Sequence, residues 1–138
     1  MGFSTVNSNK LIIISSQMET VFDCDDKSLT ETEINIDEKE YVAVCDHFPD
    51  EVIPIASCWG GSLPHKTVRG DCVDIEYYGE HEISGKKLRY QKIYLLDESG
   101  NRNLIYDNYP CYVCGFSSDG NYFALADDGG VVIIRRKK

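Results

Sequence analysis

The stretch from Tyr112 to Arg136 limits the possible folds most, because it has the pattern of three strands joined by two tight turns. The first turn is built on Ser118-Asp119-Gly120 and the second on Asp127 to Gly130. Glycine in these turns can take the positive φ that short hairpin connections need. Between the turns the residues are β-branched, aromatic or small and apolar, which is typical of buried strands. We therefore expect a three-stranded antiparallel unit here.

The rest of the chain also predicts strands. Expected strands are Lys10–Ser16, Thr20–Asp23, Thr32–Ile36, Tyr41–Cys45, Val52–Ala56, Cys72–Tyr78, Leu88–Leu96 and Asn103–Tyr106. No segment longer than about ten residues has the i, i+3, i+4 apolar spacing of a helix. Pro54 predicts a strand that lies at a sheet edge or carries a bulge, because proline cannot donate to a ladder. The polar segment 1–9 is expected to be loose.

The two halves of the chain resemble each other. Lys10-Leu-Ile-Ile-Ile parallels Lys92-Ile-Tyr-Leu-Leu, and the stretch from Ile36 to Asp46 parallels that from Phe116 to Asp127. A repeat of this length is larger than a single propeller blade. We expect one all-β domain over 1–138, with antiparallel strands in two packed sheets. Its sub-repeats would be 10–56 and 92–136, linked by 57–91.

The charge is unevenly distributed along the chain. The formal net charge is −9, and the twelve acids from Glu19 to Glu51 are opposed only by Lys27 and Lys39. Nucleic acid is a disfavoured partner, because a phosphate backbone rewards clustered lysine and arginine. A basic protein partner is favoured, since complementary fields speed association and select partners. The alternative is an acidic face that only keeps the protein soluble.

Length and hydropathy indicate a cytoplasmic protein that binds no membrane. The 138 residues suit a single domain with its own core. The aliphatic run from Leu11 to Ile14 is too short for a secretory signal. The six cysteines are therefore expected as free thiols rather than three disulfides. We expect a monomer that forms a heterodimer with its partner.

Two resemblances to known families add expectations. The phrase Phe116-Ser-Ser-Asp-Gly, with a small apolar strand and then Val131-Val-Ile-Ile after it, resembles the inner strands of a WD-repeat β-propeller blade. The Gly-His and Trp-Asp dipeptides of such blades are missing. A closed propeller needs at least about four blades, for which the chain is short. The resemblance therefore implies blade-like hairpins in an open fragment or in two packed sheets.

In size, acidity, all-β character and lack of catalytic motifs, the chain is similar to bacterial toxin-immunity proteins, including those of contact-dependent growth inhibition systems. This resemblance implies a cytosolic protein without catalytic activity or cofactor. Such a protein binds one toxin domain, often a nuclease, and covers its active site.

The residues expected to bind the partner are the clustered acids and one tryptophan. Trp59 is included because it lies in a Gly-Gly-Ser loop, and tryptophan is enriched in binding hot spots. The expected set is Asp23, Asp25, Asp26, Glu31, Glu33, Asp37, Glu38, Glu40, Asp46, Trp59, Asp71, Asp74 and Glu76. Calcium is not expected here, because the glycine and distal glutamate of an EF-hand loop are missing. At most one of Tyr77 and Tyr78 is expected to be exposed.

The alternative to a binding protein is a small thiol hydrolase or a propeller-like structural module. Cys45 and His47 could form a nucleophile and its base, or they could be a buried thiol beside a loop histidine. A metal site that adds Cys58 and His65 is disfavoured, since two ligands would lie in a loop. Cys111 and Cys114 would point to opposite faces of an extended strand and could not chelate a metal.

Overall fold

The computed structural model describes residues 1–137, and its regular structure consists of β-strands alone, as expected. The strands are β1 (Gly2–Phe3), β2 (Lys10–Ile14), β3 (Glu19–Asp23), β4 (Leu29–Glu31), β5 (Ile34–Asp37), β6 (Val42–Cys45), β7 (Ile53–Pro54), β8 (Cys72–Ile83), β9 (Lys86–Leu96), β10 (Arg102–Asn108), β11 (Val113–Phe116), β12 (Tyr122–Asp127) and β13 (Gly130–Arg135). The described residues form no helix that is long and apolar enough to cross a membrane.

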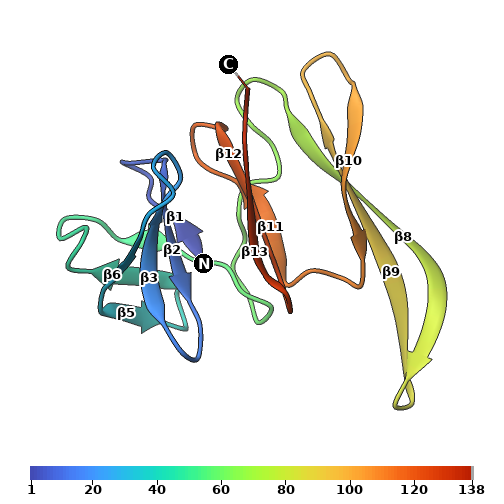
Figure 1. Ribbon diagram of the computed structural model, residues 1–138, viewed down its shortest axis with the longest axis horizontal. Helices are drawn as coiled ribbons and strands as arrows, with labels where there is room; N and C mark the ends of the chain where they lie inside the picture. Colours follow the sequence, from blue (N-terminus) through green and yellow to red (C-terminus); the bar gives the residue numbers. More distant parts are fainter. Residues whose placement is uncertain (138) are drawn as a thin grey trace.

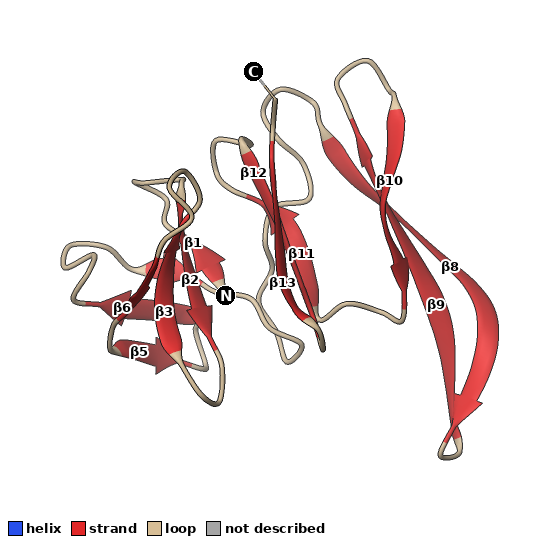
Figure 2. Ribbon diagram, in the orientation of Figure 1, coloured by secondary structure: helices blue, strands red, loops and turns tan. Residues whose placement is uncertain are grey.

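The strands form four small antiparallel sheets, where the sequence predicted two. The sheets are β1-β2-β3-β4, β5-β6-β7, β10-β9-β8 and β11-β12-β13, and each is a meander of neighbouring strands (Figures 1 and 2). The three strands expected in the C-terminal stretch are confirmed as β11, β12 and β13. Short strands between tight turns build narrow sheets, and several such sheets must stack to form a core.

The four sheets stack face to face through three apolar cores. The first core lies between β5-β6-β7 and β1-β2-β3-β4, the second between β1-β2-β3-β4 and β11-β12-β13, and the third between β11-β12-β13 and β10-β9-β8. Figure 1 shows the same order from left to right. The two central sheets therefore bury both faces.

Continuous apolar runs mark the strands of the central sheets. In β2, Leu11 and Ile13 belong to the second core, whereas Ile12 and Ile14 belong to the first. β12 shows the same alternation, because Tyr122 and Ala124 face the second core while Phe123 and Leu125 face the third. A strand that is buried on both faces cannot alternate apolar with polar residues.

The expectation that segment 1–9 is loose is wrong for its first residues. Met1, Phe3 and Ser4 are buried, and β1 pairs with β2. The backbone N–H of Ala56 donates to the carbonyl oxygen of Met1 over 2.8 Å, which ties β1 to the end of the β5-β6-β7 unit. β1 has only two residues, too few to show a period, and its burial is imposed by the sheets around it.

The segment between β7 and β8 packs against β11 instead of linking two separate halves. The N–H of Phe116 donates to the carbonyl oxygen of Pro64 over 2.7 Å, and a side-chain nitrogen of His65 lies 2.9 Å from the carbonyl oxygen of Cys114. Leu63 is buried in the second core. β8 also begins inside the expected linker 57–91. The edge position predicted for Pro54 is confirmed by β7.

The β8–β9 hairpin projects beyond the stack. β10 pairs with β9 only from Gln91 to Leu96, so the distal part of the hairpin is two-stranded and stands free (Figure 1). Tyr77 and Tyr78 are 51% and 38% exposed, so the expectation that at most one is exposed is wrong. Neighbouring residues of a strand point to opposite faces, and here both faces meet solvent.

Candidate functional site

The acidic charge lies in the unit formed by β1 to β7. Residues 1–56 have a net charge of −9, which equals that of the whole chain, and the remaining residues balance. Within the described part of the chain, only Asp23 and Asp25 among the acids of this unit form ion pairs. The other acids of the unit are not neutralised by a neighbouring cation, so this half of the stack carries a negative field.

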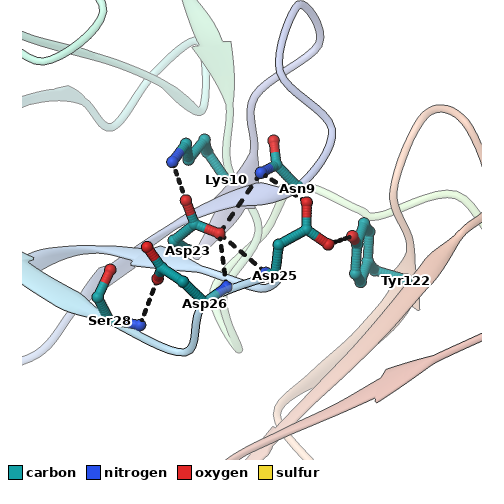
Figure 3. Close-up of polar contacts among 7 residues, drawn as sticks. All are labelled: Asn9, Lys10, Asp23, Asp25, Asp26, Ser28 and Tyr122. Carbon is teal, nitrogen blue, oxygen red and sulfur yellow. Dashed lines mark hydrogen bonds and ion pairs between the residues drawn. The ribbon is translucent and has the colours of Figure 1, made fainter.

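The first predicted acid, Asp23, is committed to the fold. Its carboxylate pairs with Lys10 on the neighbouring strand and accepts the backbone N–H groups of Asp25 and Asp26 at 2.8 and 3.2 Å (Figure 3). Lys10 and these N–H groups lower the pKa of Asp23 from its ordinary value to about 2. Asp23 therefore stabilises the turn that follows β3 rather than offering a free charge.

Asp25 links the two halves of the chain. It accepts a hydrogen bond from the hydroxyl of Tyr122 on β12 (Figure 3), and its carboxylate also lies 3.4 Å from the guanidinium of Arg135. Burial and this hydrogen bond raise the pKa of Tyr122 to about 12. Asp26 lies beside it and accepts the N–H of Ser28 over 2.8 Å, although it stays exposed. The predicted trio thus closes a turn and joins two sheets.

The predicted acids after Trp59 are neutralised by bases that are distant in sequence. Asp71 is buried and pairs with Arg136 and with the hydroxyl of Thr67. Asp74 and Glu76 share one face of β8, where both bind the guanidinium of Arg102 at 2.7 and 2.6 Å. The charge count along the sequence showed no base near these acids. The antiparallel pairing of β9 with both β8 and β10 supplies one.

The remaining predicted acids are exposed on the β1–β7 unit. Glu31 and Glu33 flank an open hollow of about 570 Å³ together with the β2–β3 turn. The β5–β6 turn carries more, and there Asp37 accepts the N–H groups of residues 39 and 40 at 2.9 and 3.1 Å. The predicted acids that are exposed and outside internal ion pairs are Asp26, Glu31, Glu33, Asp37, Glu38, Glu40 and Asp46. We call this set the acidic surface.

Trp59 is 87% exposed, although its backbone is firmly held. Ser57 and Gly60 close a tight turn with a 2.8 Å bond between the N–H of Ser57 and the carbonyl oxygen of Gly60. The N–H of Trp59 donates to the Ser57 hydroxyl over 3.1 Å, and the hydroxyl of Tyr41 donates to the Trp59 carbonyl oxygen over 2.9 Å. The turn therefore presents the indole to solvent without disorder of its own backbone.

Tyr41 fits under this turn at a cost in backbone strain. Its φ of 51° lies in the left-handed region, which is uncommon for a tyrosine. Its ring lies so close to Gly60 that a Cβ there would be 2.2 Å from the phenol carbon and oxygen. Strain of this kind clusters at functional sites, where the surrounding structure maintains it.

A pocket of about 490 Å³ opens beside Trp59. Its apolar wall comes from the N-terminal strand, β2, β5 and the residues after β7, and the polar members include a carboxylate and a phenol. The lining residues are Met1, Ile14, Ile36, Glu38, Tyr41, Ile55, Ala56, Ser57 and Trp59. We call this the Trp59 pocket, and it adjoins the acidic surface through Glu38.

The alternative Cys/His site is not assembled. Cys45 is buried in the first core, whereas His47 is exposed with its ring packed edge-on against Phe48. In residues 1–137 no hydrogen bond joins Cys45 and His47, and no cluster of three or more metal-ligating side chains forms. Cys58 is exposed beside Trp59 and His65 packs on β11, so the four residues do not meet.

The prediction that Cys111 and Cys114 point apart is wrong. Cys111 lies before β11 and not within it, so strand alternation does not apply. Both side chains pack on the third core, where the neighbouring Cys114 lowers the pKa of Cys111, while Cys111 and burial raise the pKa of Cys114. The Sγ of Cys114 is also 3.9 Å from a ring nitrogen of His65. The two thiols therefore form a partly buried pair.

Sequence reasoning missed an aromatic cluster on the projecting hairpin. Tyr90 stacks on Tyr78 and on Tyr109 with ring centroids 5.4 and 5.1 Å apart, and His81 leans against it at 6.4 Å. Tyr78 and Tyr90 are direct cross-strand partners, so their pairing could be predicted once the register was known. Tyr109 arrives from the loop after β10, and no local pattern indicates this.

Comparison with known proteins yields no match. No family model fits the sequence, and neither a curated protein nor a solved structure is significantly similar to it. The resemblances to WD-repeat blades and to toxin-immunity proteins therefore stay predictions.

Proposed function

We propose that this chain is a binding protein that occludes a basic partner, namely a toxin domain of nuclease type, and so acts as an immunity protein. The observation that carries the proposal is the acidic surface on the β1–β7 unit. Within the described residues it has no internal cation to neutralise it, while the rest of the chain is balanced. A nuclease holds phosphates with lysine and arginine, and carboxylates can occupy the same groups.

The proposed mechanism is binding without chemistry. Long-range attraction between the acidic surface and a basic cleft speeds the encounter. The interface then closes on an aromatic anchor, because buried aromatics contribute most of the binding energy at interfaces. Trp59 supplies this anchor in our proposal, since it lies at the border of the acidic surface.

The acids divide into two groups under this proposal. Asp23, Asp25 and Asp71 serve the fold through internal ion pairs, and Asp74 and Glu76 hold Arg102. The acidic surface is the group that is free to meet the partner. Charge reversal should therefore affect binding strongly only in this second group.

The test starts from the neighbouring gene, where we expect an exported protein with a basic C-terminal domain immediately upstream. Co-expression with that domain should restore growth, and the purified pair should associate at least about tenfold more slowly at high salt than at low salt. The triple variant Glu31→Lys, Glu33→Lys and Glu40→Lys should lose most of the protection.

The matched control reverses three exposed acids outside the β1–β7 unit. The variant Glu82→Lys, Glu98→Lys and Asp128→Lys changes the net charge equally and should protect as well as the wild type. Equal loss in both variants would show that net charge alone matters. Full protection by the first variant, or an association rate independent of salt, would refute the proposal.

We also infer that the two halves descend from one repeated unit. Each half has one sheet that contains β2 or β9 and then a three-stranded meander that contains β6 or β12, so that β2 corresponds to β9 and β6 to β12. The sequence parallels between these strands support the inference. A strand-for-strand superposition of the β8–β13 half on the β1–β7 half tests it, since β9 should fall on β2 and β12 on β6, and a mismatch of these strands would refute it.

A further inference from the structure

The Trp59 pocket combines features that a binding protein seldom leaves uncovered. The indole is almost fully exposed, yet the turn below it is fixed by four hydrogen bonds. An exposed indole contributes its large apolar area to binding only when a partner group covers it. Because the turn is already ordered, covering the indole costs little conformational entropy.

The chemistry of the lining selects the occupant. Isoleucines and Met1 make an apolar wall, Trp59 offers an aromatic face, and Glu38 contributes a carboxylate. Lys39 follows Glu38 in the chain but does not line the pocket, so the lining itself contains no cationic side chain. An apolar stem, a planar cationic head and a carboxylate acceptor correspond to the parts of an arginine side chain.

We propose that the Trp59 pocket is a subsite for one arginine side chain of the basic partner. The aliphatic stem lies along Ile36 and Ile55, the guanidinium stacks on the indole, and the carboxylate of Glu38 accepts its N–H groups. This subsite rests on the proposed function for its partner. It also specifies which chemistry of that partner is recognised.

The test uses the intrinsic fluorescence of Trp59, which is the sole tryptophan of the chain. The probes are three blocked tripeptides that carry arginine, citrulline or norleucine between glycines. At low ionic strength the arginine peptide should give a saturable change with a Kd of about 1 to 10 mM, and citrulline should bind about tenfold more weakly. Norleucine should bind no better than citrulline.

Two substitutions make the test specific. Glu38→Gln should weaken binding of the arginine peptide by about fivefold or more, whereas Glu98→Gln, an exposed acid of the β9–β10 turn that lies outside both the pocket and the acidic surface, should leave it unchanged. Far-ultraviolet circular dichroism checks that both variants fold. Norleucine binding as tight as that of arginine, no arginine-specific change up to about 50 mM, or insensitivity to Glu38→Gln would overturn the subsite.

The subsite and the proposed function can fail separately. If the subsite alone is wrong, the tripeptides fail while protection still depends on salt and on the acidic surface. If the proposed function is wrong, protection is absent while the arginine tripeptide still binds and still requires Glu38.

Discussion

The approach of segment 61–66 to β11 leaves no room for a side chain at Gly115, which makes Gly115→Ala a sharp test of the stack. A Cβ at this position would lie 2.3 Å from the Cβ of Leu63 and 2.8 Å from the carbonyl oxygen of Pro64. Both are parts of the chain that cannot move by a side-chain rotation. Overpacking of this kind costs about 1 to 3 kcal/mol.

A Cβ at position 115 would push segment 61–66 away from β11 and so also weaken two contacts on either side of Gly115. The 2.7 Å bond from the N–H of Phe116 to Pro64 and the contact of His65 with the Cys114 carbonyl oxygen both join the same segment to β11. Each is worth about 1 kcal/mol when made. We therefore expect Gly115→Ala to lower the free energy of unfolding by about 2 to 4 kcal/mol, a large part of the stability of a small domain.

Urea unfolding followed by circular dichroism measures this change as a shift of the midpoint at constant slope. The control is Gly129→Ala in the β12–β13 turn, where the nearest atom to the new Cβ is a side-chain oxygen of Asp127 at 3.2 Å. That carboxylate can move, so the control should change stability by less than about 0.5 kcal/mol. Equal stability of Gly115→Ala and wild type would refute the close packing of this segment on β11.

Two further predictions concern titratable groups. Lys10 holds the pKa of Asp23 in the folded protein at about 2, below the ordinary value of 3.8. The ionised Asp23 therefore contributes its full stabilisation above pH 3.8, and this stabilisation is lost as the pH falls through about 2. The free energy of unfolding of Asp23→Asn should accordingly fall less steeply between these two pH values than that of the wild type. In alkylation by iodoacetamide at neutral pH, Cys58 should be labelled first because it is exposed, and Cys24 should resist because burial raises its pKa to about 12. Mass spectrometry locates the label, and rapid modification of Cys45 would instead favour the thiol-enzyme alternative.

Much of the fold could be predicted from local patterns. Turn glycines and β-branched runs placed β11 to β13 and most of the other strands within one to three residues of their observed ends. The number of sheets could not be predicted in this way. A run such as Leu11–Ile14 shows that a strand is buried on both faces but does not show which sheets cover it.

The candidate site, like the fold, could be predicted from the sequence only in part. Sequence alone located the acidic segment and proposed Trp59, and the structure confirms that the indole is exposed. The sequence could not show that Asp71 is buried against Arg136, or that Arg102 binds Asp74 and Glu76. These pairs join residues 26 to 65 positions apart, so no local charge count contains them.

The sequence by itself determined the all-β class, the turns and the imbalance of charge, because each depends on residues that are neighbours in the chain. Only the tertiary structure decided that the C-terminal unit packs on the N-terminal sheet, where Tyr122 meets Asp25. The same packing leaves the acidic surface and the Trp59 pocket open on the other half of the stack. Contacts across sheets depend on which apolar faces meet, and that is a property of the assembled layers rather than of any one segment.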